Sequence, residues 1–252
     1  MDREILSQEE LDALLRGATI EPEPKPGPEP ETMVESVLSS TQIDAIGEIG
    51  NITYGSASTT LSELLNYKVI IDTPTVFIST QRKIQEQHPI PYLIVEVDYK
   101  QGLLGSNVLI VKIEDASIIA ALMMGLENVE PKSVLDQMEL SAVGEAMNQM
   151  IGSASTSLAQ LFAKKIQIEA PTVRIVDFAL EEPVIKGSHL DEQIVAISFQ
   201  LQIGDLIDSE IMLLIPTNIA VELSDALISK TLQMDLNISE PAPVPILMNE
   251  PV

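Results

Sequence analysis

The sequence contains no cysteine and no tryptophan, and only two of its 252 residues are histidine. The lack of cysteine excludes a disulfide framework, a thiolate zinc site and a cysteine nucleophile. With only His88 and His189, a histidine-based metal site or catalytic triad is poorly supplied. A reducing cytoplasm is therefore the expected location.

Basic residues are also few, because 14 lysines and arginines stand against 38 acidic residues and the formal net charge is −24. Such a chain is not expected to bind the phosphate backbone of nucleic acid or an anionic lipid surface. No cationic segment precedes an apolar stretch at the start, so a signal peptide is not indicated. The longest apolar run, residues 118–126, is too short to insert into a membrane. The expected partner is a basic or neutral protein surface.

Proline marks the expected domain boundaries. Five of the 16 prolines lie in residues 21–30 and four in the last twelve residues, and both stretches resemble extended, solvated linkers. Apolar periodicity is strong between them. The sequence thus predicts an N-terminal segment (1–16), a Pro/Glu-rich linker (17–34), one globular unit (35–232) and a proline-rich tail (233–252).

The globular unit contains a duplication. Residues 44–76 align with residues 141–173 at a constant offset of 97, with 16 identities in 33 positions and no gap. This long period predicts two half-repeats, at about 35–130 and 131–232, rather than a solenoid array. The small residues of GSAST, at 55–59 and again at 152–156, are interpreted as allowing close packing of neighbouring elements rather than as chemistry.

Each half-repeat is expected to run helix, strand pair, short helix. Capping-box patterns begin the long helices, at Ser39 with Gln42 and at Asp136 with Glu139. Alternating apolar segments then predict strand pairs, and the runs ASIIAALMMG and NIAVELSDALIS predict the short helices. The fold class is therefore α+β with pseudo-twofold symmetry. Apolar side chains at helical spacing predict the buried stripes, which are Ile43, Ile46, Gly50, Tyr54, Ala57 and Leu61 in the first helix and Met147, Ile151, Ala154, Leu158 and Leu161 in the second.

A polar triad occupies the opposite side of each long helix. At 100° per residue, offsets of 0, 4 and 7 place the three side chains within a wedge of about 60° that should face solvent. Polar residues on an outer helix face are ordinary, and shared ancestry alone could leave them identical. Their recurrence at the same spacing in both copies nevertheless favours a function. The triads are Asp44, Glu48 and Asn51, and Ser141, Glu145 and Asn148; Pro74 and Pro171 follow the two asparagines at the same distance.

This pattern, [D/S]-x3-E-x2-N-x22-P in two copies, resembles the signature of the CheC/CheX/FliY family of phosphatases that act on phospho-CheY. The resemblance implies a CheC-like duplicated unit, with a mainly antiparallel sheet flanked by the two motif-bearing helices. It also implies that Asn51 and Asn148 position the attacking water, and that Glu48 and Glu145 pair with a lysine of the regulator. A carboxamide can orient water without being a strong base.

The remaining signature positions are expected to support the helices and strands. Asp44 and Ser141 are interpreted as stabilising their helices, and Pro74 and Pro171 as lying at strand starts, where a missing N–H is tolerated. The resemblance implies no cofactor of the chain's own, because the Mg²⁺ belongs to the CheY site.

The N-terminal segment predicts a second functional unit. Residues 6–15 form a short amphipathic helix pattern that is marginal alone and suited to folding into a partner's groove. Docking back onto the globular unit is the alternative. The segment resembles the CheY-binding peptide of the flagellar switch proteins FliM and FliY. The residues that carry this resemblance are Leu6, Ser7, Gln8, Glu10, Leu11, Asp12, Leu14 and Leu15.

The peptide and the duplicated motif occur together in the FliY branch of the family. The resemblance implies a flagellar motor switch phosphatase at the cytoplasmic face of the basal body, with phospho-CheY, FliM, FliG and FliN as partners. A FliN-like domain, which usually follows in that branch, is absent, so the chain is expected to be truncated or to have that domain supplied separately. Two alternatives are a non-enzymatic, FliM-like scaffold that only binds phospho-CheY and a stand-alone CheC-type phosphatase without a motor role.

Overall fold

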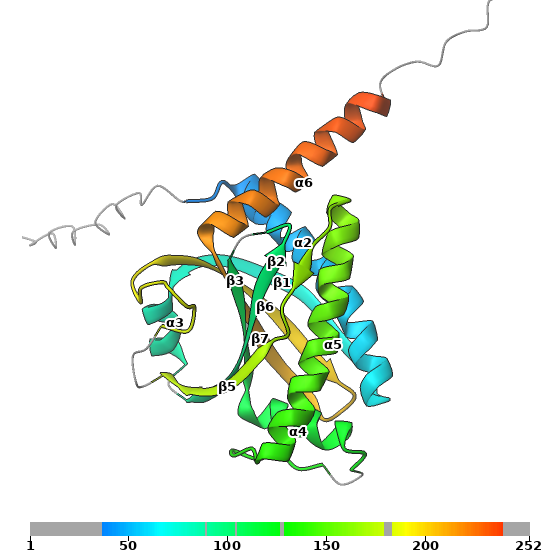
Figure 1. Cartoon of the computed structure of the whole chain (residues 1–252), viewed down its shortest axis with the longest axis vertical. Helices are drawn as coiled ribbons and strands as arrows, with labels where there is room; N and C mark the ends of the chain where they lie inside the picture. The colour runs from blue at the N-terminus through cyan, green and yellow to red at the C-terminus, as the bar shows by residue number, and fades with distance from the viewer. Residues whose placement is uncertain (1–36, 89, 104, 127–128, 179–182, 239–252) are drawn as a thin grey trace, which may run out of the picture. The chain divides into compact units, whose positions relative to one another are not determined.

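The computed structural model describes residues 37–88, 90–103, 105–126, 129–178 and 183–238. The residues predicted to form the N-terminal peptide, the 17–34 linker and most of the proline-rich tail lie outside these ranges. The elements of the described part, shown in Figure 1, are α2 (Ser40–Leu65), β1 (Val69–Thr80), α3 (Gln81–Gln87), β2 (Pro91–Gln101), β3 (Ser106–Lys112), α4 (Ile113–Met123), α5 (Gln137–Phe162), β4 (Gln167–Ile168), β5 (Thr172–Asp177), β6 (Gln193–Ile203), β7 (Ile207–Pro216) and α6 (Thr217–Ile238).

The seven strands form one antiparallel sheet in which the two half-repeats exchange their first strands. The order is β1-β6-β7-β3-β2, with β4 and β5 both paired to β2 at the far edge. Thus β1 of the first half pairs with β6 of the second, and β5 of the second pairs with β2 of the first. The centre of the sheet is the β3–β7 pair, in register from Val108 with Leu214 to Ile110 with Met212. Each strand of one half therefore occupies the place that its equivalent in the other half occupies when the sheet is read from the opposite edge.

The predicted α+β class and pseudo-twofold symmetry are confirmed. Both predicted strand pairs form, as β2–β3 and as β6–β7, and each is followed by a predicted helix, α4 or α6. One boundary differs, because α6 continues to Ile238 whereas the tail was expected to start at residue 233. No proline or glycine interrupts residues 217–238, so nothing in the local sequence ends the helix at residue 232.

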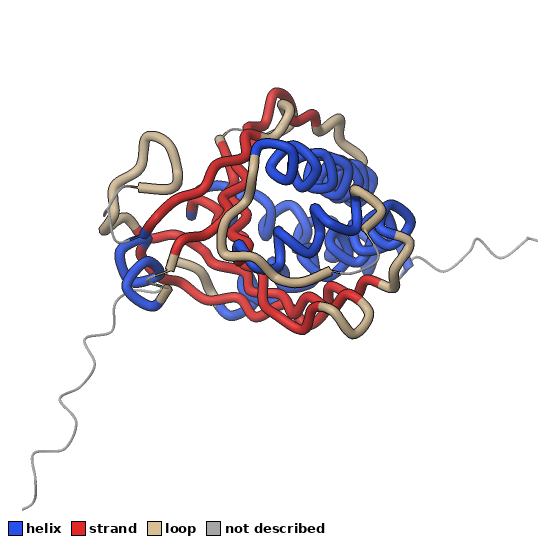
Figure 2. The backbone as a smooth tube through the Cα atoms, turned by 90° about the horizontal axis from the view of Figure 1, so that it is seen from below, coloured by secondary structure: helices blue, strands red, loops and turns tan. Residues whose placement is uncertain are grey.

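The sheet has a hydrophobic core on each face. Helices α2 and α5 lie side by side on one face, and the sheet curls around them (Figures 1 and 2). Alternation along β2 sends Leu93 and Val95 into the core under these helices, while Tyr92 and Ile94 join a separate core with α3. The predicted stripes of α2 and α5 are buried or half-buried, as expected. The opposite sides of both helices therefore remain available to solvent.

Both predicted capping boxes are present and fix where the motif helices begin. In α2, Ser39 accepts from the Gln42 N–H and the Gln42 side chain accepts from the Ser39 N–H. In α5, Asp136 and Glu139 make the same reciprocal pair, and Glu139 also bonds the Lys132 ammonium. The N3 position is thus neutral in α2 and charged in α5.

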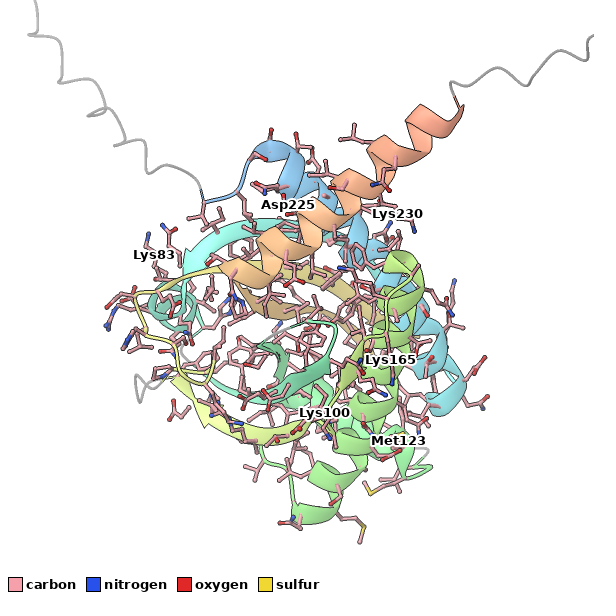
Figure 3. All side chains as sticks on the ribbon, turned by 45° about the horizontal axis from the view of Figure 1, so that its top comes forward. Lys83, Lys100, Met123, Lys165, Asp225 and Lys230 are labelled. Atoms are coloured by element: carbon pink, nitrogen blue, oxygen red, sulfur yellow. The ribbon has the colours of Figure 1, made fainter. Side chains whose placement is uncertain are left out.

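Helix α6 ties the two motif helices together (Figure 3). Near the start of α2, the Gln42 amide donates to the Asp225 carboxylate at 2.9 Å. Near the end of α5, the Lys230 ammonium donates to the carbonyl oxygen of Leu161. One helix therefore contacts opposite ends of the two motif helices.

The GSAST repeats meet where α2 crosses α5. The hydroxyl oxygens of Ser56 and Ser153 lie 3.2 Å apart and share a hydrogen bond, and Ala57 is fully buried. The close-packing interpretation is confirmed for these positions. It is wrong for Gly55 and Gly152, because a Cβ at either would have no heavy atom within 4 Å.

The crossing generates a stability prediction. Gly55→Ala and Gly152→Ala should each raise the free energy of unfolding by about 0.5–1 kcal/mol, because alanine is the better residue in a helix interior. Ser56→Leu should lower it by about 1–3 kcal/mol, because the larger side chain must force the helices apart. Urea denaturation measures all three, and a destabilised Gly55→Ala variant would contradict the assignment of open space there.

The helix starts generate a pH prediction. The Lys132 ammonium, followed by the Asp136 N–H, lowers the pKa of Glu139. A carboxyl group whose pKa is lower in the folded state stabilises the fold at pH values above its unfolded pKa of about 4.3. That contribution to the free energy of unfolding is lost as the pH falls through the folded-state pKa. Glu139→Gln should therefore cost about 0.5–1 kcal/mol at pH 7 and much less at pH 3.5 in denaturation experiments. An equal cost at both pH values would show that the ion pair is not its source.

Candidate functional site

The first polar triad faces solvent on α2. Asp44, Glu48 and Asn51 are all exposed, as predicted, while Ile46 and Ile49 between them are buried. No hydrogen bond or ion pair involves the Glu48 carboxylate or the Asn51 amide within the described part of the chain. Both groups are therefore free to meet a docked molecule.

The second triad occupies the equivalent side of α5. Ser141 and Glu145 are exposed and Asn148 is half-buried. The Ser141 hydroxyl donates to the Gln137 carbonyl oxygen at 2.9 Å, a back-bond that does not by itself stabilise the helix, so the helix-stabilising role stays a prediction. The Glu145 carboxylate accepts a hydrogen bond from the Gln149 amide at 2.8 Å.

Gln149 was not identified from the sequence. A comparison of the two repeats could have identified it, because Gln149 takes the place of Ile52 at the offset of 97. A polar residue four positions after a glutamate on a helix can bond to it, whereas isoleucine cannot. The two triads therefore match in their glutamate and asparagine but not in what surrounds them.

Each triad lies beside an edge strand of the sheet. A Cβ on Gly47, next to Glu48, would lie 3.7 Å from the Val76 side chain of β1. A Cβ on Gly144, next to Glu145, would lie 3.5 Å from Val173 of β5. Each motif helix thus packs directly on the strand that contains its signature proline, as in β1, or follows it, as in β5.

The two prolines differ in position. Pro171 directly precedes β5, as predicted. The prediction for Pro74 is wrong, since it lies inside β1, where the pairing with β6 shifts register between Asp72 and Thr75. An edge strand tolerates a proline at such a bulge because no ladder hydrogen bond is required there.

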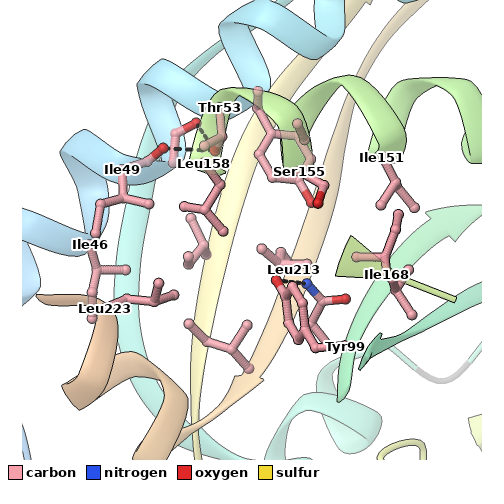
Figure 4. Close-up of a pocket in the computed structure, with 17 residues that line it drawn as sticks. Ile46, Ile49, Thr53, Tyr99, Ile151, Ser155, Leu158, Ile168, Leu213 and Leu223 are labelled. Atoms are coloured by element: carbon pink, nitrogen blue, oxygen red, sulfur yellow. Dashed lines mark hydrogen bonds between the residues drawn. The ribbon is translucent and has the colours of Figure 1, made fainter. Parts of the chain in front are cut away.

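An apolar cavity of about 60 Å³ lies on the other side of α2, between the motif helices and the sheet (Figure 4). Its polar groups include Tyr99, whose hydroxyl accepts from the Asn107 amide at 3.0 Å. Burial raises the pKa of Tyr99 to about 12, so this phenol stays protonated near neutral pH. Among the residues that the structure describes, those lining the cavity include no carboxylate, lysine or histidine.

The exposed triads offer a different capability. A glutamate and an asparagine one turn apart can bind a cation of a docked molecule and orient a water in its site. Within the described ranges, no three histidine or acidic side chains gather into a possible metal site. None of the helices described is long and apolar enough to cross a membrane. The glutamate and asparagine of each triad lie on the outer side of a helix and not in the cavity, an arrangement that suits contact with another protein better than enclosure of a small substrate.

Comparisons with known proteins agree with this site. Residues 42–78 and 138–175, which contain both triads, match the CheC-like family. The flagellar motor switch phosphatase FliY of Bacillus subtilis (strain 168) is 43% identical over 250 residues, an alignment that covers 96% of this chain. The chain spans 64% of the length of that protein.

Solved structures show the same fold. The crystal structure of Thermotoga maritima FliY matches with a TM-score of 0.72 and 36% identity, over 77% of this chain and 99% of that one. The FliM middle domain from H. pylori matches with a TM-score of 0.60 and 14% identity, over 75% of this chain and 99% of that one, and shares the fold. With a duplicated motif in the matched segments and a FliY structure covered almost in full, the chain belongs to the FliY branch of the CheC-like family.

Proposed function

We propose that this chain is a flagellar motor switch phosphatase that hydrolyses the aspartyl phosphate of phospho-CheY. The observation that carries the proposal is the presence of two solvent-facing Glu-x2-Asn pairs on symmetry-related helices, with both asparagine amides unengaged within the described residues. The similarity to a FliY named as a motor switch phosphatase supports it.

The proposed chemistry needs little from the protein. An aspartyl phosphate is an acyl phosphate, and its hydrolysis requires a water in line with the phosphorus. Water attacks phosphorus, the bond from phosphorus to the aspartate oxygen breaks, and the products are inorganic phosphate and the free carboxylate. Asn51 or Asn148 accepts from this water and orients it, and Glu48 or Glu145 binds a lysine of the regulator. The Mg²⁺ in this scheme belongs to the regulator.

The proposed setting is the switch complex at the cytoplasmic face of the flagellar basal body, with FliM, FliG and FliN as neighbours. The name of the B. subtilis relative supports this placement. The competing function is a non-enzymatic, FliM-like scaffold that binds phospho-CheY. The shared fold with FliM middle domains is compatible with either, because fold alone does not determine activity.

The decay of phosphorylated CheY separates the two functions. Wild-type protein should accelerate the decay, and Asn51→Ala or Asn148→Ala should each leave the activity of the other site. The double variant should lose activity by about 100-fold or more, because no amide then orients the water. Asn218→Ala, at an exposed asparagine on α6, is the matched control and should retain full activity. A wild-type protein that leaves the decay at CheY's own rate would establish the scaffold instead.

We further propose that residues 6–15 capture phospho-CheY and hold it near the two sites. Tethering raises the local substrate concentration without altering the reacting groups. Deletion of residues 1–16 should therefore raise KM several-fold and leave kcat within about twofold, as measured from initial rates of phosphate release. Scrambling residues 21–30 at constant length is the control and should change neither. A fall in kcat after the deletion would contradict the tether.

A further inference from the structure

Five positions on each motif helix share one solvent-facing side. At 100° per residue, residues 41, 44, 48, 51 and 52 of α2 fall within a wedge of about 100°, as do residues 138, 141, 145, 148 and 149 of α5. All ten side chains are exposed except Asn148, which is half-buried. We call these two sets motif face 1 and motif face 2.

The two faces agree at the glutamate and the asparagine and differ at the other three positions. Each face has one exposed apolar side chain, but the two lie at opposite ends. Motif face 1 has Ile52, with 37% of its surface exposed, where motif face 2 has Gln149. Motif face 2 has Met138, which is 69% exposed, where motif face 1 has Thr41.

The apolar side chains stand at different distances from the asparagines. Ile52 directly follows Asn51, about 1.5 Å further along the helix axis, whereas Met138 precedes Asn148 by ten residues, or about 15 Å. Any protein whose phosphorylated residue Asn51 reaches must also cover Ile52. A standard interface of about 800 Å² on one partner has a radius of about 16 Å, so one centred near Asn148 extends to Met138.

The charges of the two faces also differ. Motif face 1 carries two carboxylates, Asp44 and Glu48, neither of which is paired within the described residues. Motif face 2 carries one, Glu145, which Gln149 holds at 2.8 Å. The first face therefore attracts a cationic site more strongly, and the second presents its glutamate already oriented.

We propose that the two motif faces are unequal docking surfaces for the phosphorylated response regulator, with Ile52 as the apolar anchor of motif face 1 and Met138 as that of motif face 2. This inference rests on the proposed function, because it takes the regulator as the occupant. The regulator fits both faces because each glutamate and asparagine lies inside the area that a docked protein covers. The anchors determine affinity, while the asparagines determine turnover.

The test exchanges the anchors in proteins with one working site. In the Asn148→Ala protein motif face 1 is the working site, and in the Asn51→Ala protein motif face 2 is the working site. Ile52→Gln and Met138→Thr place in each face the residue that occupies the same position in the other. Each exchange is made in both backgrounds of the full chain, and an excess of synthetic peptide 6–15 prevents the N-terminal tether from masking changes in docking. Initial rates of phosphate release from phosphorylated CheY then give KM and kcat.

Ile52→Gln should raise KM about five- to tenfold when motif face 1 is the working site, with kcat within about twofold, because apolar area buried on docking is lost. It should change nothing when motif face 2 is the working site. Met138→Thr should show the reverse pattern. Ile52→Leu should retain the wild-type KM, and Leu232→Gln, at an exposed leucine on α6, is the matched control off both faces.

The outcomes separate the inference from the proposed function. If the single-site proteins are active but neither exchange changes their KM, the assignment of the two anchors is wrong and the phosphatase proposal is unaffected. If no protein accelerates the decay, the phosphatase proposal fails, and titration calorimetry with beryllofluoride-activated CheY tests the anchors directly. Ile52→Gln and Met138→Thr should then each weaken binding several-fold, and unchanged affinity in both would overturn the inference.

Discussion

The pairing of β1 with β6 and of β5 with β2 is the constraint on which the rest of the structure depends. Each half-repeat gives its first strand to the sheet of the other half, so neither can complete its sheet alone. The exchange places both motif helices on one face of a single sheet, related by the axis that passes between β3 and β7. The position of one motif helix is consequently coupled to that of the other.

The edges of the same sheet explain where the triads lie. Because β1 and β5 lie at opposite edges, the helices packed on them expose their outer sides at opposite flanks of the molecule's described part. Two protein partners could meet these flanks without sharing one surface. The crossing at Ser56 and Ser153 lies between them, at positions that carry no motif residue.

The sequence predicted those features that depend on local chemistry. The capping boxes at Ser39 and Asp136, the buried stripes and the exposed triads follow from helical spacing alone, and the offset of 97 predicted the symmetry. Strand exchange could not be predicted, since a repeat shows which segments are alike and not which of them pair. The register shift at Pro74 and the Gln149–Glu145 bond depend on tertiary register and on one side-chain conformation, neither of which leaves a periodic signal.

The interior and the surface of the duplicated helices have diverged to different extents, which bears on whether the triads are relics. Some buried positions related by the offset differ strongly: Gly50 and Thr53 in α2 correspond to Met147 and Met150 in α5. The smaller pair lies at the 60 Å³ cavity, while the methionines fill the equivalent space in the other half.

Shared ancestry acts on every position of the two helices alike. Packing should preserve buried residues best, because a change of volume in a core is felt directly, whereas an exposed polar residue is replaced at little cost. Here two buried pairs have changed, although Ala57 with Ala154 and Leu61 with Leu158 have not, and the glutamate and asparagine on the outer side of both helices are kept. Neither ancestry nor stability requires the glutamate and the asparagine to be kept. A requirement imposed from outside the chain, by a molecule that meets Glu48 with Asn51 and Glu145 with Asn148, does account for it.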